Sequence, residues 1–225
     1  MREPFLFSNF SVRQPPGVFP VGTDALLLGR WADVEAGPRI LDVGAGTGVI
    51  TLMLAARAQA RYGQEFEATG VELNETAARV ARQNFEASPW RINMRVAHED
   101  IRRYAARRAG VFDLIVSNPP FFDHLTRPSD PARLLARSAG YLTQHQLLES
   151  ALSLLADGGR LCVIFPLLEG RRFVEMATLR GLYTRREASV FSKPDKPPIR
   201  LLLEFSRNPR FFSKEKICLQ ETQQK

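Results

Sequence analysis

The sequence lacks any long apolar run. Its 225 residues contain nothing near the roughly 18 consecutive apolar residues that span a bilayer. Residues 1–10 carry one arginine and one glutamate without an apolar core, so we expect no signal peptide. These absences predict a cytoplasmic protein with no membrane partner. Hydrophobic residues make up 44% and charged residues 24%, which is typical of a globular domain.

Cysteine and histidine are scarce as well. Cys162 and Cys218 are far apart, and Cys162 lies in an apolar run, as a small core residue would. None of the three histidines is at metal-ligand spacing from another histidine or a cysteine. No serine has the sequence context of a nucleophile elbow. The chain is therefore expected to have no disulfide framework, no metal site and no hydrolase triad.

Lysine is absent from the first 190 residues, and the positive charge is unevenly distributed. Residues 1–179 hold 20 basic and 19 acidic side chains, whereas residues 180–225 hold 11 and 5. A basic surface attracts polyanions, so the C-terminal region favours a nucleic-acid partner. The alternative interpretation is a solvated surface that keeps the protein soluble.

Strand and helix patterns alternate along most of the chain. This order predicts an α/β fold with a mostly parallel sheet covered on both faces. The last two strands are joined by a loop too short for a helix, so we expect an antiparallel pair at one edge. The seven expected strands are residues 39–43, 67–72, 93–96, 112–117, 160–165, 183–191 and 199–205. The expected helices are residues 23–31, 48–60, 75–87, 144–156 and 169–180.

The chain divides into three expected parts. Residues 1–36 form an N-terminal extension that packs near the ligand cleft, and Thr23 is expected to cap its helix. Residues 37–210 form the main domain. Residues 211–225 are expected to be a basic, flexible tail. Nothing in the sequence fixes an oligomeric state, so a monomer is the default expectation.

A glycine-rich segment, Asp42-Val43-Gly44-Ala45-Gly46-Thr47-Gly48, connects the first core strand to a helix. Such a turn brings the backbone close to a ligand, and the helix start offers amides to an anionic group. A dinucleotide site would need a glycine at position 49, which is Val49. The observed order resembles the first motif of class I methyltransferases, which bind S-adenosylmethionine. That resemblance implies a Rossmann-like fold, with Asp42 holding the amino group of the cofactor's methionine part over Gly44, Gly46 and Gly48.

Two further acidic positions fit that cofactor. Glu72 ends the second core strand, where a carboxylate can accept hydrogen bonds from both ribose hydroxyls. Asp100 follows the third strand and could accept from the adenine amino group. Glu99 is an alternative to Asp100 for this role. A solvent-exposed charge at a strand end is the non-functional interpretation of each.

The fourth strand ends in Asn118-Pro119-Pro120-Phe121. Proline stops the strand, so Asn118 is expected at its carboxyl end, where open α/β sheets bind ligands. The Asn118 side-chain oxygen and the Pro119 carbonyl can accept from an exocyclic amine, which localises its lone pair. Phe121 offers a stacking face, worth roughly 1–3 kcal/mol for a base. The motif predicts N-methylation of a planar amine; a rigid strand terminator is the alternative.

Together these motifs resemble the bacterial tRNA(Val) adenine-N6 methyltransferase family. The resemblance also rests on Val21-Gly22-Thr23-Asp24-Ala25-Leu26-Leu27-Leu28-Gly29-Arg30-Trp31 and on Pro198-Ile199-Arg200-Leu201-Leu202. It implies an enzyme that uses S-adenosylmethionine to methylate the N6 amine of an adenine in RNA, with tRNA favoured. It also implies that Thr23 and Asp24 line the cofactor site.

The chain departs from this family at two positions. Pro20 stands where relatives carry a lysine, which removes a possible phosphate or cofactor contact. Phe121 replaces the commoner tyrosine, which removes a hydroxyl but keeps the stacking face. The alternative acceptors are guanine N2 of ribosomal RNA and a protein glutamine amide. DNA is less favoured, because no sizeable extra domain is present to recognise its sequence. A non-catalytic module that binds cofactor or RNA is the alternative of another class.

Overall fold

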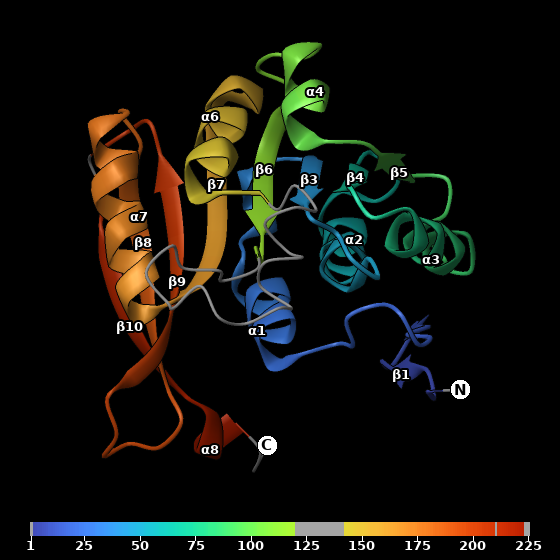
Figure 1. The fold of residues 1–225 in the computed structure, drawn as a ribbon, viewed down its shortest axis with the longest axis horizontal. Coiled ribbons are helices and arrows are strands. Elements are labelled where there is room, and N and C mark those ends of the chain that lie inside the picture. The colour runs from blue at the N-terminus through green and yellow to red at the C-terminus, as the bar shows by residue number, and fades with distance from the viewer. Residues whose placement is uncertain (1, 120–141, 210, 223–225) are drawn as a thin grey trace, which may run out of the picture.

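The computed structural model describes residues 2–119, 142–209 and 211–222. A large β-sheet forms the middle layer, and helices cover both of its faces (Figure 1). The strands are β1 (Phe5–Leu6), β2 (Ser11–Val12), β3 (Arg39–Val43), β4 (Glu67–Glu72), β5 (Met94–His98), β6 (Phe112–Ser117), β7 (Leu155–Pro166), β8 (Tyr183–Phe191), β9 (Pro198–Ser206) and β10 (Ser213–Cys218). The helices are α1 (Thr23–Trp31), η1 (Val34–Ala36), α2 (Val49–Tyr62), α3 (Glu75–Glu86), α4 (Ile101–Ala106), α6 (Gln144–Leu154), α7 (Leu167–Leu179) and α8 (Leu219–Thr222).

The main sheet, as far as the structure describes it, has eight strands in the order β10-β8-β9-β7-β6-β3-β4-β5. Strands β5, β4, β3, β6 and β7 pair in parallel along the sheet. Strand β9 is antiparallel to both of its neighbours, β7 and β8. The predicted class, a mostly parallel α/β sheet with antiparallel pairing toward one edge, is confirmed. Strands β1 and β2 form a separate small hairpin.

The eighth strand corrects the sequence prediction. Seven strands were expected, with a flexible tail from residue 211. Instead β10 pairs in parallel with β8 over its whole length and forms the edge of the sheet. Its Lys-Glu-Lys pattern lacks the apolar alternation that identifies a half-buried strand. The Glu215 carboxylate accepts a hydrogen bond from Trp31 Nε1, which ties this edge to α1.

The core lies in two layers, one on each face of the sheet. On β6, Leu114 and Val116 pack with residues of α1, α2 and α3. Ile115 points the other way and packs with residues of α4, α6 and α7. All three side chains are fully buried, because a central parallel strand is covered on both faces. This burial holds the carboxyl end of β6 at a fixed position.

Three local details differ from the sequence predictions. Gly22, not Thr23, is the N-cap of α1, and no side chain caps that helix. Helix α4 was not predicted; it begins where the Asp100 side chain accepts from the Arg102 backbone N–H. Strand β7 begins at Leu155, with a register shift against β6. No helix in the described ranges is long and apolar enough to cross a membrane.

Candidate active site

The site forms at the carboxyl ends of four adjacent strands. Strands β6, β3, β4 and β5 lie side by side and parallel, so the segments that follow them meet at one edge of the sheet (Figure 1). Val43, the last residue of β3, is opposite both Val71 of β4 and Ser117 of β6. The Ser117 hydroxyl donates to the Val43 carbonyl oxygen at 2.8 Å. The residues predicted for the site therefore lie at this edge of the sheet, as expected: the glycine segment, Glu72, Asp100 and Asn118.

The glycine loop, residues 44–48, has the backbone conformation that its sequence predicts. Gly44, Gly46 and Gly48 have φ values of 77°, 58° and 81°, which side chains rarely tolerate. A Cβ at Gly48 would also lie 2.4 Å from Cε1 of Phe85. Gly48 is the N-cap of α2, and no side chain caps it. The first turn of α2 thus offers backbone amides at the ligand edge. Within the loop, the N–H groups of Gly44, Ala45, Gly46 and Gly48 already donate to acceptors of the fold.

Asp42 is fully buried beneath this loop. Its Oδ2 atom accepts from the Thr51 hydroxyl at 2.7 Å and from the Thr51 backbone N–H at 3.2 Å. Among the described residues, its Oδ1 atom has no hydrogen-bond partner. Burial raises the pKa of Asp42 to about 7, and the nearby Glu72 carboxylate adds to that increase. A buried acceptor without a donor is unfavourable, so Oδ1 is an unsatisfied acceptor at this site.

Glu72 connects the end of β4 to the glycine loop. Its Oε2 atom accepts from the Gly46 backbone N–H, and its Oε1 atom accepts from the Asn74 backbone N–H, both at 2.8 Å. These bonds fix the carboxylate in one orientation. Each carboxylate oxygen has two lone pairs, so both can still accept from a ligand hydroxyl.

Asp100 and Glu99, the two candidates for adenine recognition, both pair with arginines. Asp100 caps α4 and forms an ion pair with Arg102, which lowers the pKa of Asp100. Glu99 pairs with both terminal nitrogens of Arg107, at 2.6 and 2.5 Å, and its pKa is lowered as well. Both side chains are therefore ionised acceptors that are already engaged. The role of Asp100 in cofactor binding stays a prediction.

Helix α1 lies beside this edge of the sheet (Figure 1). Thr23 is its exposed first residue. The Asp24 carboxylate forms an ion pair with Arg200 of β9, with 2.9 Å between Oδ2 and Nε. Sequence reasoning missed this pair, although both residues belong to the segments that carried the family resemblance. The contact fixes the start of α1 against the start of β9, and a cofactor role for Thr23 and Asp24 stays a prediction.

The segment after β6 begins as expected. Asn118 is half-buried and Pro119 is buried at the end of the strand. Both follow Ser117, which is hydrogen-bonded to the glycine-loop strand. Phe121, the predicted stacking residue, lies outside the described residues. The structure therefore brings Asn118 and Pro119 to the same edge as the glycine loop and Glu72.

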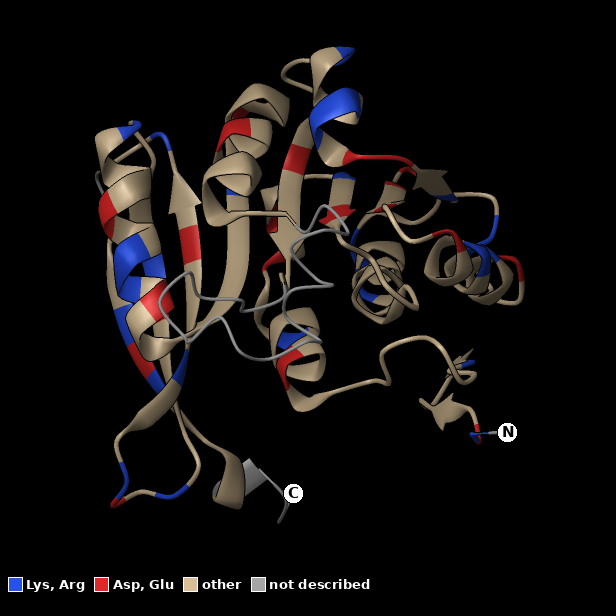
Figure 2. Ribbon diagram, viewed as in Figure 1, with Lys and Arg blue, Asp and Glu red and all other residues tan. Residues whose placement is uncertain are grey.

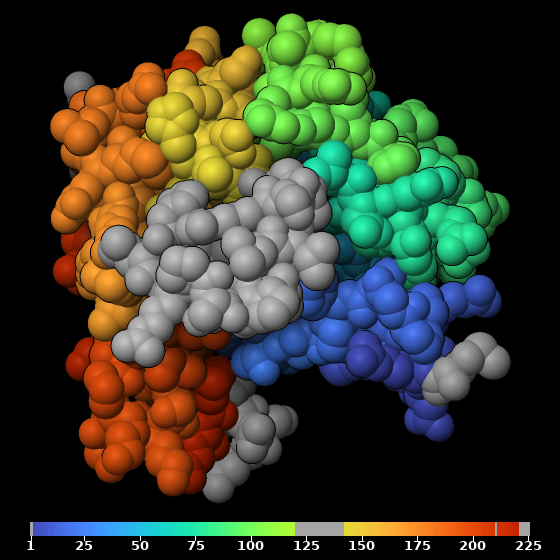
Figure 3. All heavy atoms as spheres, viewed as in Figure 1, coloured from blue at the N-terminus to red at the C-terminus, as the bar shows by residue number. Residues whose placement is uncertain are grey.

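Asn84, on α3, is a site residue that sequence reasoning missed. Its side chain is 1% exposed and donates to the Thr47 carbonyl in the glycine loop at 2.8 Å. It also exchanges hydrogen bonds with the backbone N–H and carbonyl of Arg13, at 2.9 and 3.1 Å. Figure 3 shows the N-terminal segment lying against α3. The available signal was an asparagine in the apolar stripe of α3, at helical spacing from Ala77 and Ala81.

Comparison with known proteins gives this geometry a family. Residues 9–177 match the family model of the methyltransferase small domain. Over 97% of the chain and 89% of the relative, the sequence is 43% identical to a tRNA1(Val) (adenine(37)-N6)-methyltransferase from Tolumonas auensis. A protein of the same name from Trichodesmium erythraeum is 37% identical over 97% of the chain and 90% of the relative. The chain belongs to this methyltransferase family.

A solved structure of another protein has the same fold. The crystal structure of a predicted O-methyltransferase from Agrobacterium tumefaciens superposes with a TM-score of 0.65. The two sequences are 21% identical, and the match covers 88% of each chain. Together with the family assignment, this fold makes the protein a class I methyltransferase whose methyl donor is S-adenosylmethionine.

Proposed function

We propose that this methyltransferase transfers a methyl group to the exocyclic N6 amine of adenine 37 in a tRNA, as the names of its relatives state for them. The observation that carries the proposal is the position of Asn118 and Pro119, next to the glycine loop at the ends of β6 and β3. A cytoplasmic location is part of the proposal, because tRNA is the acceptor. Guanine N2 of ribosomal RNA and a glutamine amide are the competing acceptors.

The proposed cofactor contacts follow from the hydrogen bonds at the site. We assign the buried, unpartnered Oδ1 of Asp42 to the ammonium group of the methionine part. The Glu72 oxygens, held by Gly46 and Asn74, accept from the ribose hydroxyls. The backbone of the glycine loop would lie beneath the methionine part, and Asp100 would accept from the adenine amine. When bound, S-adenosylmethionine supplies a methyl group already activated by a sulfonium.

The chain's task is then to position the acceptor amine. The lone pair of an adenine amine is delocalised into the ring, so the amine is a weak nucleophile. The Asn118 side-chain oxygen and the Pro119 carbonyl each accept one N–H, which turns the lone pair toward the methyl group. With S-adenosylmethionine bound, the amine would take the methyl group as its bond to sulfur breaks. Asn118 and Pro119 would hold the two N–H groups until the nitrogen gives one proton to solvent. Proximity and electrostatics supply the rate, without a strong base.

The test is methyl transfer to several acceptors in parallel. Wild-type protein, Asn118→Ala and Asn208→Ala are incubated with labelled cofactor and unmodified tRNA, ribosomal RNA, DNA or release factor. Asn208 is an exposed asparagine just after β9, at the opposite end of the sheet, and serves as the matched control. We expect N6-methyladenine in tRNA, a loss of at least about 100-fold in kcat for Asn118→Ala, and no change for Asn208→Ala. Label in ribosomal RNA or release factor instead of tRNA would refute the proposal that tRNA is the methyl acceptor.

A further inference from the structure

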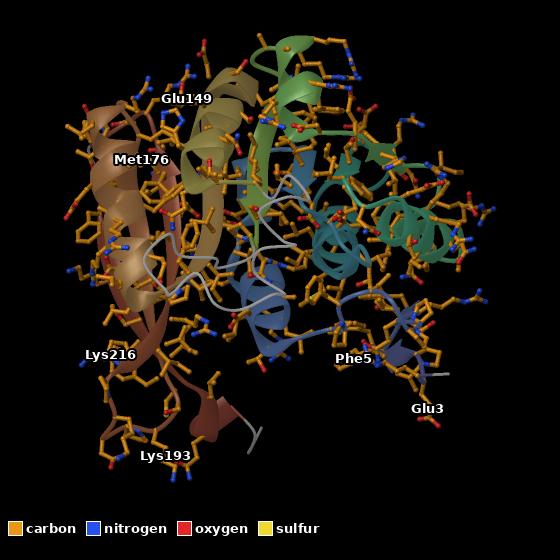
Figure 4. All side chains as sticks on the ribbon, viewed as in Figure 1. Glu3, Phe5, Glu149, Met176, Lys193 and Lys216 are labelled. Atoms are coloured by element: carbon orange, nitrogen blue, oxygen red, sulfur yellow. The ribbon has the colours of Figure 1, made fainter. Side chains whose placement is uncertain are left out.

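Four exposed lysines lie at the β10 edge of the sheet and in the loop between β8 and β9. Lys193 and Lys196 belong to the loop, and Lys214 and Lys216 belong to β10. We call these four residues the lysine edge. Figure 2 shows the basic positions along β10 and the loop, and Figure 4 shows Lys216 at the side of the strands and Lys193 at the tip of the loop. Such an arrangement presents several cations to one extended partner.

Nearby acidic groups neutralise the lysine edge only in part. Glu187 is 5% exposed and binds both terminal nitrogens of Arg171, at 2.6 and 2.9 Å, and it also forms an ion pair with Lys214 at 3.9 Å. Glu215 points to the other face of β10, where it accepts from Trp31. Asp195 is the single acid of the β8–β9 loop. The charge of the lysine edge is therefore mostly left for a partner outside the chain.

Exposed aromatic rings accompany these charges. Phe211 and Phe212, just before β10, are 61% and 55% exposed. The Arg185 guanidinium lies over the Phe211 ring at 5.4 Å, and the Lys214 ammonium over the Phe212 ring at 5.3 Å. Cations interleaved with exposed rings are typical of surfaces that bind nucleic acid, where phosphates meet the charges and bases stack on the rings.

The lysine edge begins at the same end of the sheet as the proposed acceptor site. Strand β9 starts beside Phe191, the last residue of β8, and beside Pro166, the last residue of β7. Because β7 is parallel to β6, the β8–β9 loop emerges at the end where Asn118 follows β6. The Arg200–Asp24 ion pair fixes the start of β9 against α1. A polyanion whose target nucleotide is in the site can thus continue along this flank.

We propose that the lysine edge binds the phosphate backbone of the tRNA substrate, away from the nucleotide that is methylated. This inference rests on the proposed function and adds the surface that holds the rest of the acceptor. One flipped base offers the enzyme little area, whereas a folded RNA presents closely spaced phosphates. The surface contributes affinity and orientation, while the residues at the ends of β3 and β6 act on the base.

The test compares matched pairs of substitutions. Lys193→Ala/Lys196→Ala and Lys214→Ala/Lys216→Ala each remove two charges from the lysine edge. The control pair, Arg61→Ala/Arg91→Ala, removes two exposed charges near the starts of β4 and β5, at the opposite end of the sheet. tRNA binding is measured across a salt series, together with KM and kcat for methyl transfer and the affinity for S-adenosylmethionine. Circular dichroism checks that every variant is folded.

Each lysine pair should raise the KM for tRNA and leave kcat and cofactor affinity unchanged. The slope of log K against log salt should fall by about 1.5 per pair, because each lost phosphate contact contributes about 0.7 to 0.9. The control pair should behave as wild type. If the slope is unchanged in both lysine pairs and tRNA is still methylated, the lysine edge does not bind the tRNA backbone. The proposed function would be unaffected by that result.

Two other outcomes separate this inference from the proposed function. A wild-type protein that binds tRNA but methylates another acceptor would refute the proposed function. Comparing tRNA binding by the lysine variants and wild type would still show whether the lysine edge binds tRNA. Binding to phosphatidylserine vesicles that the lysine substitutions abolish, with tRNA binding unaffected, would assign the surface to a membrane and overturn the inference.

Discussion

The Asn84 side-chain nitrogen donates a hydrogen bond of 2.8 Å to the carbonyl oxygen of Thr47, inside the glycine loop. The same side chain pairs with both backbone polar groups of Arg13. One buried amide therefore joins the N-terminal segment, α3 and the cofactor loop, which are distant in sequence. The loop is held from the side as well as from the strand below it.

Asn84→Ala should weaken cofactor binding indirectly, because Asn84 supports the glycine loop and does not itself contact the cofactor. Removing the amide leaves the Thr47 carbonyl and the Arg13 backbone without these partners, at a cost of about 1–3 kcal/mol in the free energy of unfolding. Calorimetric titration with S-adenosylmethionine should show reduced affinity. Asn93→Ala is the control, because Asn93 also donates to two backbone carbonyls but at the opposite end of the sheet. Equal affinities in the two variants would contradict a positioning role for Asn84.

Gly48→Ala should destabilise the protein more than Gly44→Ala. Both glycines have positive φ values, so each alanine incurs about 1–2 kcal/mol of backbone strain. At Gly48 the new Cβ would also clash with the Phe85 ring, 2.4 Å away, whereas nothing lies within 4 Å at Gly44. Overpacking of this kind adds about 1–3 kcal/mol. Urea unfolding without cofactor measures both, and equal losses would mean that Phe85 moves aside freely.

The stability of the protein should depend on the protonation of Asp42. The pKa of Asp42 is about 7 in the folded protein, against an ordinary value of 3.8. Between these pH values the carboxyl is protonated in the folded state and ionised in the unfolded state. The stabilising effect of the protonated form is complete below about pH 4 and is lost as the pH rises through 7, at up to about 1.4 kcal/mol per pH unit. Asp42→Asn cannot ionise. The difference between the unfolding free energies of wild type and Asp42→Asn, measured from pH 4 to 8, should follow this decline; a flat difference would refute it.

Glu72→Gln should reduce cofactor affinity by about tenfold or more, because an amide replaces one carboxylate oxygen and cannot accept there. Either the Gly46 or the Asn74 backbone N–H then loses its acceptor, and one proposed ribose contact is lost too. Equilibrium binding of S-adenosylmethionine provides the measurement. Glu75→Gln, three residues further along and exposed in the first turn of α3, is the charge-matched control. A similar loss in Glu75→Gln would point to net charge rather than to the Glu72 contacts.

The parts of this site that could be predicted are those that depend on residues close together in the chain. The glycine spacing gives the loop its backbone, and the Pro119 position ends β6, because both depend on residues a few positions apart. The unpredicted parts join segments that are far apart. The Arg13–Asn84 contact spans 71 positions and the Asp24–Arg200 pair spans 176. Helical spacing can mark Asn84 as a buried residue, but it does not identify its partner, because only the folded topology brings the two segments together.

Strand β10 also determines how the sheet ends. Without it, the nine residues of β8 would be an unpaired border with free backbone donors and acceptors, open to pairing with a second copy of the chain. The strand that covers this border carries lysines at alternate positions, and charged side chains at an outer strand discourage intermolecular pairing. We therefore expect the lysines of β10 to discourage edge-to-edge pairing between copies of the chain, independently of what else they bind.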